Sequence, residues 1–152
     1  MKNDLGVQIE PAQLKTLRTI GLALASGAVL FATIATALPF ISGGAPAPSD
    51  VEPDTGVVQV LSMVHGFLFM TTIVMAAAMP SILAAKVTPQ QAHAPYILRW
   101  ALVEGPALFG SVIVLLAGLG GVLPGESMYY LNLVSTVAMV TFVLTDLGRL
   151  KG

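Results

Sequence analysis

Glu104 is the residue in this sequence best suited to proton chemistry, because it lies within a long apolar run that includes the stretch RWALVEGPALFG. A charge in the hydrocarbon core of a bilayer costs on the order of 3 kcal/mol, so such a carboxyl faces a bundle interior, finds hydrogen-bond partners or stays protonated. Pro106 lacks the N–H that would bond to the carbonyl of Leu102. The stretch therefore fits either a carboxyl that binds and releases a proton or a buried carboxyl that satisfies backbone at a proline kink.

His65 is the second candidate and lies in another apolar run. Counting along the helices places Glu104 and His65 roughly 12 Å in from opposite ends, so we expect that the two side chains do not touch. A proton path between them is one interpretation, and a lone histidine bonded to a threonine is the commoner case. The polar residues at similar depth are Ser26 and Thr141 for Glu104, and Thr33, Thr36, Asn132 and Thr136 for His65.

The residue inventory argues against most enzyme classes. The chain has no cysteine, which removes disulfides, thiolate metal sites and thiol nucleophiles. It has no spaced cluster of metal ligands, no P-loop and no dinucleotide fingerprint, so we expect neither a metal nor a cofactor. A net charge of −1 argues against nucleic acid as a partner. An enzyme acting on lipid or quinone would have to use Asp146, Arg149 and His93, which are scattered near helix ends.

The composition indicates an integral membrane protein. Of the 152 residues, 55% are hydrophobic and only 10% are charged, whereas a soluble domain carries about a quarter charged residues. Four apolar runs are each long enough to meet the ~20 residues that a bilayer requires, at about residues 19–41, 57–85, 96–122 and 128–148. We therefore expect one all-α transmembrane domain over residues 1–152, a four-helix bundle with proline kinks at Pro80 and Pro106.

The basic residues predict the orientation of the bundle. Every lysine and arginine precedes the first run, flanks the loop between the second and third, or follows the fourth. Because cytoplasmic loops are enriched in such residues, we expect an up-down-up-down topology with both termini in the cytoplasm. Trp100, Tyr129 and Tyr130 are expected to act as interfacial anchors, and Arg99 to extend to the membrane interface.

Small residues are frequent on the expected helices. The third run carries Ala101, Gly105, Gly110, Ala117 and Gly121. Membrane helices approach one another closely through such residues. They fit either ordinary packing within the bundle or a dimer or ring interface on the glycine-rich face of the third helix.

The stretch from Ile97 to Gly118 resembles a family of small four-helix bacterial membrane proteins of unassigned function. Their motif is Arg, then Trp or Ala, then Ala-Leu-x-Glu-Gly and Ala-Leu-Phe-Gly, and here it covers Arg99 to Gly110, with Pro106 where a small residue is usual. The resemblance implies a four-pass fold in the bacterial inner (cytoplasmic) membrane. It implies no chemical activity, because the function of that family is unassigned. A fainter likeness to the proteolipid subunits of rotary ATPases would imply that Glu104 binds and releases a proton, although their glycine-repeat inner helices are not found here.

Two functional interpretations follow from these residues. The first is a non-enzymatic tetraspan protein, an accessory or structural subunit of a larger membrane complex or a homo-oligomer. Its partners would be the lipid bilayer and other membrane subunits or further copies of itself. The alternative is a proton- or ion-coupled membrane protein that uses Glu104.

Overall fold

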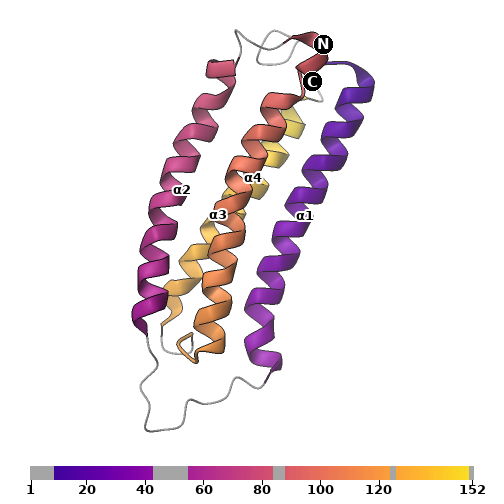
Figure 1. Cartoon of the computed structure of the whole chain (residues 1–152). Helices are drawn as coiled ribbons and strands as arrows, with labels where there is room; N and C mark the ends of the chain where they lie inside the picture. Colours follow the sequence, from indigo (N-terminus) through magenta and orange to yellow (C-terminus); the bar gives the residue numbers. More distant parts are fainter. Residues whose placement is uncertain (1–8, 43–54, 84–87, 124–125, 151–152) are drawn as a thin grey trace, which may run out of the picture.

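Helices make up nearly all of the computed structural model, which describes residues 9–42, 55–83, 88–123 and 126–150. The long helices are α1 (Pro11–Ile41), α2 (Thr55–Leu83), α3 (Ala94–Leu119) and α4 (Val134–Arg149). Two 3₁₀ segments, η1 (Pro89–Gln91) and η2 (Ser127–Leu133), precede α3 and α4. The described residues contain no strand, and the helices lie side by side along one axis (Figure 1). The predicted all-α class is confirmed.

The first and fourth helices begin at residues other than those predicted from the sequence. α1 begins at Pro11, about two turns before the expected start, because Glu10 and Gln13 form a capping box and a proline suits the first helical position. The fourth span begins as η2 and becomes α-helical only at Val134. Residues 84 and 85, which were expected to end the second helix, lie outside the described part of the chain.

Four segments are long and apolar enough to cross a membrane. They are Pro11–Ile41, Thr55–Leu83, Pro89–Leu119 and Ser127–Arg149. Pro80 and Pro106, which were expected to kink their helices, lie inside helices that continue on both sides of them, and Pro39 does the same in α1. These spans indicate a multi-pass membrane protein.

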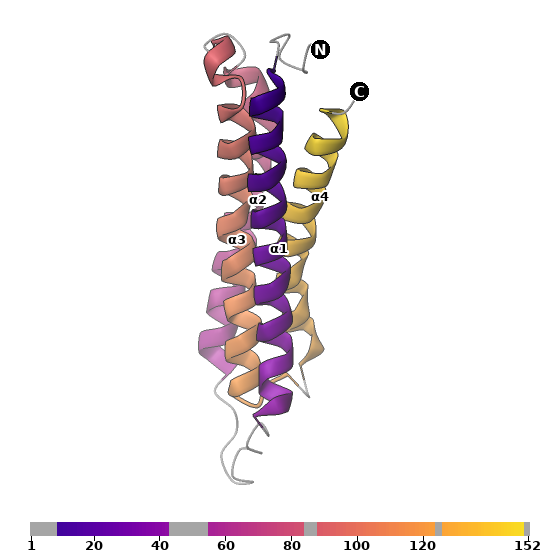
Figure 2. The ribbon, with the colours of Figure 1, turned by 90° about the vertical axis from the view of Figure 1, so that its right-hand side faces the viewer.

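α3 is the central helix of the bundle, as the two perpendicular views show (Figure 1, Figure 2). It packs against α1, α2 and α4, and twelve of its residues are buried. α2 has only three buried residues, Val58, His65 and Ala76, because it packs mainly against α3. α3 therefore borders each of the other three long helices.

One end of the bundle gathers arginines, and we call it the arginine end, defined by Arg18, Arg99 and Arg149. A single core cluster at this end joins the start of α1, the start of α3 and the end of α4; its buried members are Leu17, Ala25, Tyr96, Trp100, Val143, Leu147 and Leu150. The side-chain amide of Gln13 donates to the carbonyls of Pro89 and Gln90, which brings η1 to the same end. The start of α2 packs instead against the end of α3, where Val58 meets Ile113 and Val114.

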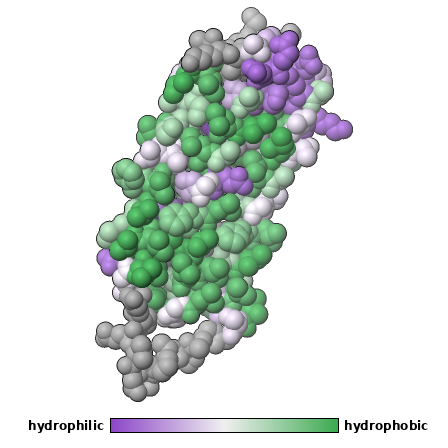
Figure 3. All heavy atoms as spheres, viewed as in Figure 1, coloured by the Kyte–Doolittle hydropathy of each residue, from purple (hydrophilic) through white to green (hydrophobic). Residues whose placement is uncertain are grey.

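The surface agrees with a lipid environment. Apolar residues cover most of the face shown in Figure 3, and hydrophilic residues gather where α1 begins. Large side chains point outward from every long helix; among them Leu30, Phe67, Leu116 and Val137 are 62%, 73%, 43% and 66% exposed. In water such a surface would drive aggregation, whereas a bilayer solvates it.

Two predictions about interfacial residues are wrong. Trp100 and Tyr129 are buried against neighbouring helices instead of lying at a lipid interface. Arg99 does not extend to the interface as an isolated charge; its guanidinium forms an ion pair with Asp146 on α4. Trp100 and Arg99 both donate to the Asp146 carboxylate inside the bundle, which position along a helix alone does not reveal.

The small residues of α3 divide between two faces. Gly110 and Ala117 are buried against other helices, so these two serve packing within the bundle. Ala101 and Gly105 are exposed, and a Cβ at Gly105 would meet nothing within 4 Å. The outward small residues are therefore available for contact with lipid or with another protein.

Candidate functional site

A buried polar cluster lies where α2, α3 and the start of α4 meet. His65 on α2 is 4% exposed, and its Nε2 lies 3.0 Å from the carbonyl oxygen of Pro106 and 3.0 Å from the hydroxyl of Ser135. Phe69 and Phe109 enclose the imidazole with ring centroids 6.1 and 5.9 Å away. A histidine buried in this way needs partners, and backbone and hydroxyl supply them.

The contacts of this cluster favour one pattern of donors. The Pro106 carbonyl can only accept, and the Ser135 hydroxyl also lies 2.9 Å from the carbonyl of Asn132. If Nε2–H of His65 donates to Pro106, the hydroxyl of Ser135 is left to donate to Asn132. In this arrangement the carbonyls of Pro106 and Asn132 each accept one hydrogen bond. It requires the tautomer of His65 that carries its proton on Nε2.

The predicted neighbours of His65 are only partly brought together. Asn132 donates to the hydroxyl of Ser62 and to the carbonyl of Tyr129, and Thr136 lies 3.3 Å from the carbonyl of Ala107. Both residues belong to the same junction of helices as His65. Thr33 and Thr36 bond to backbone carbonyls of their own helix α1 and take no part in it.

Ser135 is the member of the cluster that counting by depth did not single out. It follows Asn132 by three residues, a spacing that places two side chains on one face of a helix. Gly110 explains how the helices come close enough, since a Cβ there would overlap the Asn132 carbonyl and lie 2.9 Å from both His65 Nε2 and Ser135 Oγ. In the sequence, the signal that could have pointed to Ser135 was Gly110, because a glycine lets polar side chains of neighbouring helices come close.

The cluster should contribute measurably to stability. We expect His65→Ala to lower the free energy of unfolding by about 2 kcal/mol, because it removes a buried hydrogen bond and leaves a cavity beside Phe69 and Phe109. Unfolding in mixed micelles measures this change. Thr33→Val is the matched control, since Thr33 is exposed and bonds only to its own helix; equal losses in the two variants would contradict a structural role for His65.

Glu104 lies at the edge of the outward face of α3. It is partly exposed, and Ala101 and Leu108, three residues before and four after it, are both exposed. Among the described residues no hydrogen bond or ion pair joins Glu104 to a partner. Ser26 and Thr141 donate to backbone carbonyls of their own helices, at Ala23 and Val137.

Glu104 and His65 belong to different sides of α3. A Cβ at Gly110 would lie 2.9 Å from the Nε2 of His65, and Gly110 follows Glu104 by six residues, which places it roughly 120° around the helix axis from Glu104. No contact between these two side chains occurs in the described structure, in keeping with their expected separation. The structure therefore gives no direct link for a proton path between them.

A second polar cluster joins α3 and α4 at the arginine end. The carboxylate of Asp146 accepts from Arg99 Nη1 at 2.8 Å and from Trp100 Nε1 at 2.9 Å. Asp146 is 2% exposed, and the Arg99 guanidinium lies 4.5 Å from the ring centre of Phe142. One carboxylate thus holds a cation and an indole together, the arrangement that a buried charge requires.

The scattered residues considered for an enzyme do not form a single site. Asp146 is committed to Arg99 and Trp100, whereas His93 precedes α3 and lines a groove with Leu83 and Leu98. In the described residues no three histidine or carboxylate side chains are grouped to hold a metal ion. The two clusters join helices to one another, and Glu104 on α3 belongs to neither of them.

Comparison with known proteins finds no matching family model, no matching curated protein and no matching solved structure. The two resemblances noted for the stretch from Arg99 to Gly110 therefore stay predictions.

Proposed function

We propose that this chain is a non-enzymatic tetraspan subunit of the bacterial inner membrane that assembles with other membrane proteins or with further copies of itself. In this proposal the helices run up-down-up-down and both termini lie in the cytoplasm. Arg18, Arg99 and Arg149 support that orientation, because they belong to one end of the bundle and basic residues favour the cytoplasmic side.

The observation that carries the proposal is the outward position of Glu104. A carboxyl at the edge of a lipid-facing surface, without a partner among the described residues, is costly in a bilayer whether it is charged or neutral. Contact with another protein removes that cost by supplying a hydrogen bond. Ala101 and Gly105, exposed beside Glu104, would let the backbone of a partner helix approach.

The rest of the bundle supports a structural role. Its buried polar groups bond to one another between helices, as His65 does with Pro106 and Asp146 does with Arg99. Little of the described chain lies outside the four spans. Such a protein acts through the surface that it offers to the membrane.

A cysteine placed on this surface tests the proposal, since the natural chain has none and each variant carries a single thiol. We expect Leu108→Cys, labelled with a photoreactive maleimide in native membranes, to cross-link to protein. Val137→Cys on α4 is the matched control, because Val137 is 66% exposed on a different helix. Protein adducts at position 108 and lipid adducts alone at position 137 are the expected result; lipid adducts alone at both would contradict the proposal.

Proton or ion coupling through Glu104 is the second candidate, and the same outward carboxyl favours it. A proton-carrying group must be reached from outside its own bundle, which the partial exposure of Glu104 permits. Glu104→Gln separates the two candidates, because an amide still bonds across an interface but cannot ionise. Coupling predicts that the substitution abolishes proton flux into liposomes containing the chain, whereas a purely structural role predicts no flux from either form.

A further inference from the structure

An open groove of about 480 Å³ lies where the end of α2 meets the start of α3. Both segments are found at the same end of the bundle (Figure 1). A volume of this size is typical of small-molecule sites in proteins. The described residues that line the groove include Leu83 from α2, Gln91 and His93 ahead of α3, and Ile97, Leu98 and Ala101 on α3.

The groove changes from polar to apolar along α3. Gln91 and His93 precede the helix, whereas Ile97, Leu98 and Ala101 follow within it. From His93 to Ala101 is about 12 Å along the helix axis, which carries the groove from a membrane interface into the hydrocarbon region. Leu98 is 50% exposed, so the apolar part of the groove is open to lipid. A ligand that fits must be polar at one end and apolar at the other.

The imidazole of His93 lacks a hydrogen bond that a ligand would supply. Its Nδ1 is shielded from solvent and has no hydrogen-bond partner among the described residues. Such an atom is rare in proteins, because it has lost its bond to water and has gained none in return. Gln91, an exposed residue, adds a side-chain amide to the same groove. The polar end of a ligand therefore has two side chains with which it can form hydrogen bonds.

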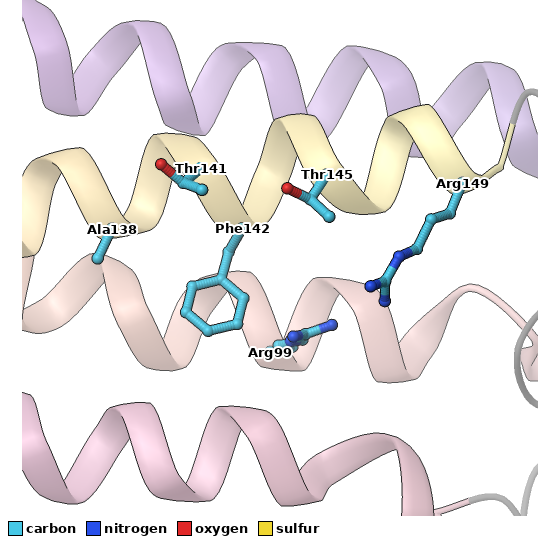
Figure 4. Close-up of a pocket in the computed structure, with 6 residues that line it drawn as sticks. All are labelled: Arg99, Ala138, Thr141, Phe142, Thr145 and Arg149. Atoms are coloured by element: carbon cyan, nitrogen blue, oxygen red, sulfur yellow. The ribbon is translucent and has the colours of Figure 1, made fainter.

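The described residues that line this groove include no lysine, arginine, aspartate or glutamate. Arg99 and Arg149 line a separate groove along α4, where Figure 4 shows them with Phe142. An ionised head group beside His93 would meet no counter-charge from the described lining residues, and an unpaired charge is costly at the edge of the hydrocarbon region. The groove therefore favours an uncharged ligand.

We propose that this groove binds an uncharged glycerolipid with a free hydroxyl, a diacylglycerol, from the leaflet at the same end of the bundle. The hydroxyl bonds to His93, and an acyl chain runs along Leu98 and Ala101. A hydroxyl both donates and accepts, so it matches Nδ1 in either tautomer of the imidazole, whereas a quinone carbonyl only accepts and matches one. This chain forms the groove by itself and Glu104 does not line it, so the site stands independently of any partner protein.

Lipid-dependent stability of the full chain in neutral-detergent micelles tests the site. Dioctanoylglycerol should raise the melting temperature, because a ligand of the native state stabilises it by mass action. Propylene glycol dioctanoate has the same acyl chains and no hydroxyl, and we expect it to bind about tenfold more weakly, the effect of one hydrogen bond. In His93→Phe, which keeps a ring and removes both nitrogens, the two lipids should bind equally.

The other outcomes of this experiment overturn the proposal. Equal affinity of the natural chain for the two lipids, or a preference for the hydroxyl that persists in His93→Phe, would rule out the contact with His93. Tighter binding of a short-chain quinone than of dioctanoylglycerol would replace the lipid by a carbonyl ligand. Should His93→Phe fail to fold, Ala101→Leu fills the apolar part of the groove, and Ala77→Leu, at an exposed position of α2 that is not among the lining residues, is its control. Equal binding of dioctanoylglycerol by these two variants would contradict the site.

Discussion

Gly110→Ala should destabilise the bundle by about 3 kcal/mol, near the upper end of what overpacking one methyl group costs. The added Cβ would overlap the backbone carbonyl of Asn132, which cannot rotate away as a side chain does. It would also press on His65 and Ser135, so α3 would have to move away from the junction that holds α2 and α4. A steric effect and the loss of the buried hydrogen bonds therefore act together.

Unfolding of the variant in mixed micelles, followed by circular dichroism, measures the loss. Gly27→Ala is the matched control, because Gly27 lies within α1 and a Cβ there meets nothing within 4 Å. The control should be neutral or more stable by up to about 1 kcal/mol, since alanine favours a helix over glycine. If the two variants unfold alike, the close approach of α3 at Gly110 is not what holds this junction together.

Asp146→Ala should cost about 3 kcal/mol, because it leaves the Arg99 guanidinium and the Trp100 indole N–H without their shared acceptor. Asp146→Asn should cost less, since the amide oxygen can still accept from one of them. The pair is well shielded, with side-chain exposures of 13% for Arg99 and 3% for Asp146, so screening by solvent does little to soften the loss.

A double-mutant cycle isolates this interaction. Arg99→Gln combined with Asp146→Asn should be more stable than the sum of the single losses predicts, because the pair then holds no uncompensated charge. Thr145→Ala, an exposed change one residue before Asp146, serves as the control and should stay within about 0.5 kcal/mol of the natural chain. Additive losses across the cycle would show that Arg99 and Asp146 do not depend on each other.

The sequence predicted the helical class and the number of membrane spans well, because apolar runs of this length have few other solutions. It also placed Asn132 and Thr136 at the junction where His65 lies. The sequence did not predict which way a side chain points around its helix. Ser26 and Thr141 are both exposed, and each donates to a backbone carbonyl of its own helix instead of bonding to Glu104.

The cluster of Asp146, Arg99 and Trp100 was missed for the same reason. An aspartate near the end of the fourth span and an arginine near the start of the third were both visible, but Arg99 was expected at the membrane interface and Asp146 was considered only as a scattered residue near a helix end. Depth counting could have paired them, since these two helix ends meet at the arginine end. Counting by depth does not reveal that α3 is the central helix. That central position decides which faces of α1, α2 and α4 turn inward.

Native mass spectrometry of the tagged full-length chain, extracted in mild detergent from its own membranes, tests most directly whether this protein works as a subunit. We predict a species heavier than the 15.7 kDa chain, containing either further copies or other membrane proteins. A lone chain that carries lipid and nothing else, under conditions that preserve known complexes from the same membranes, would contradict the account.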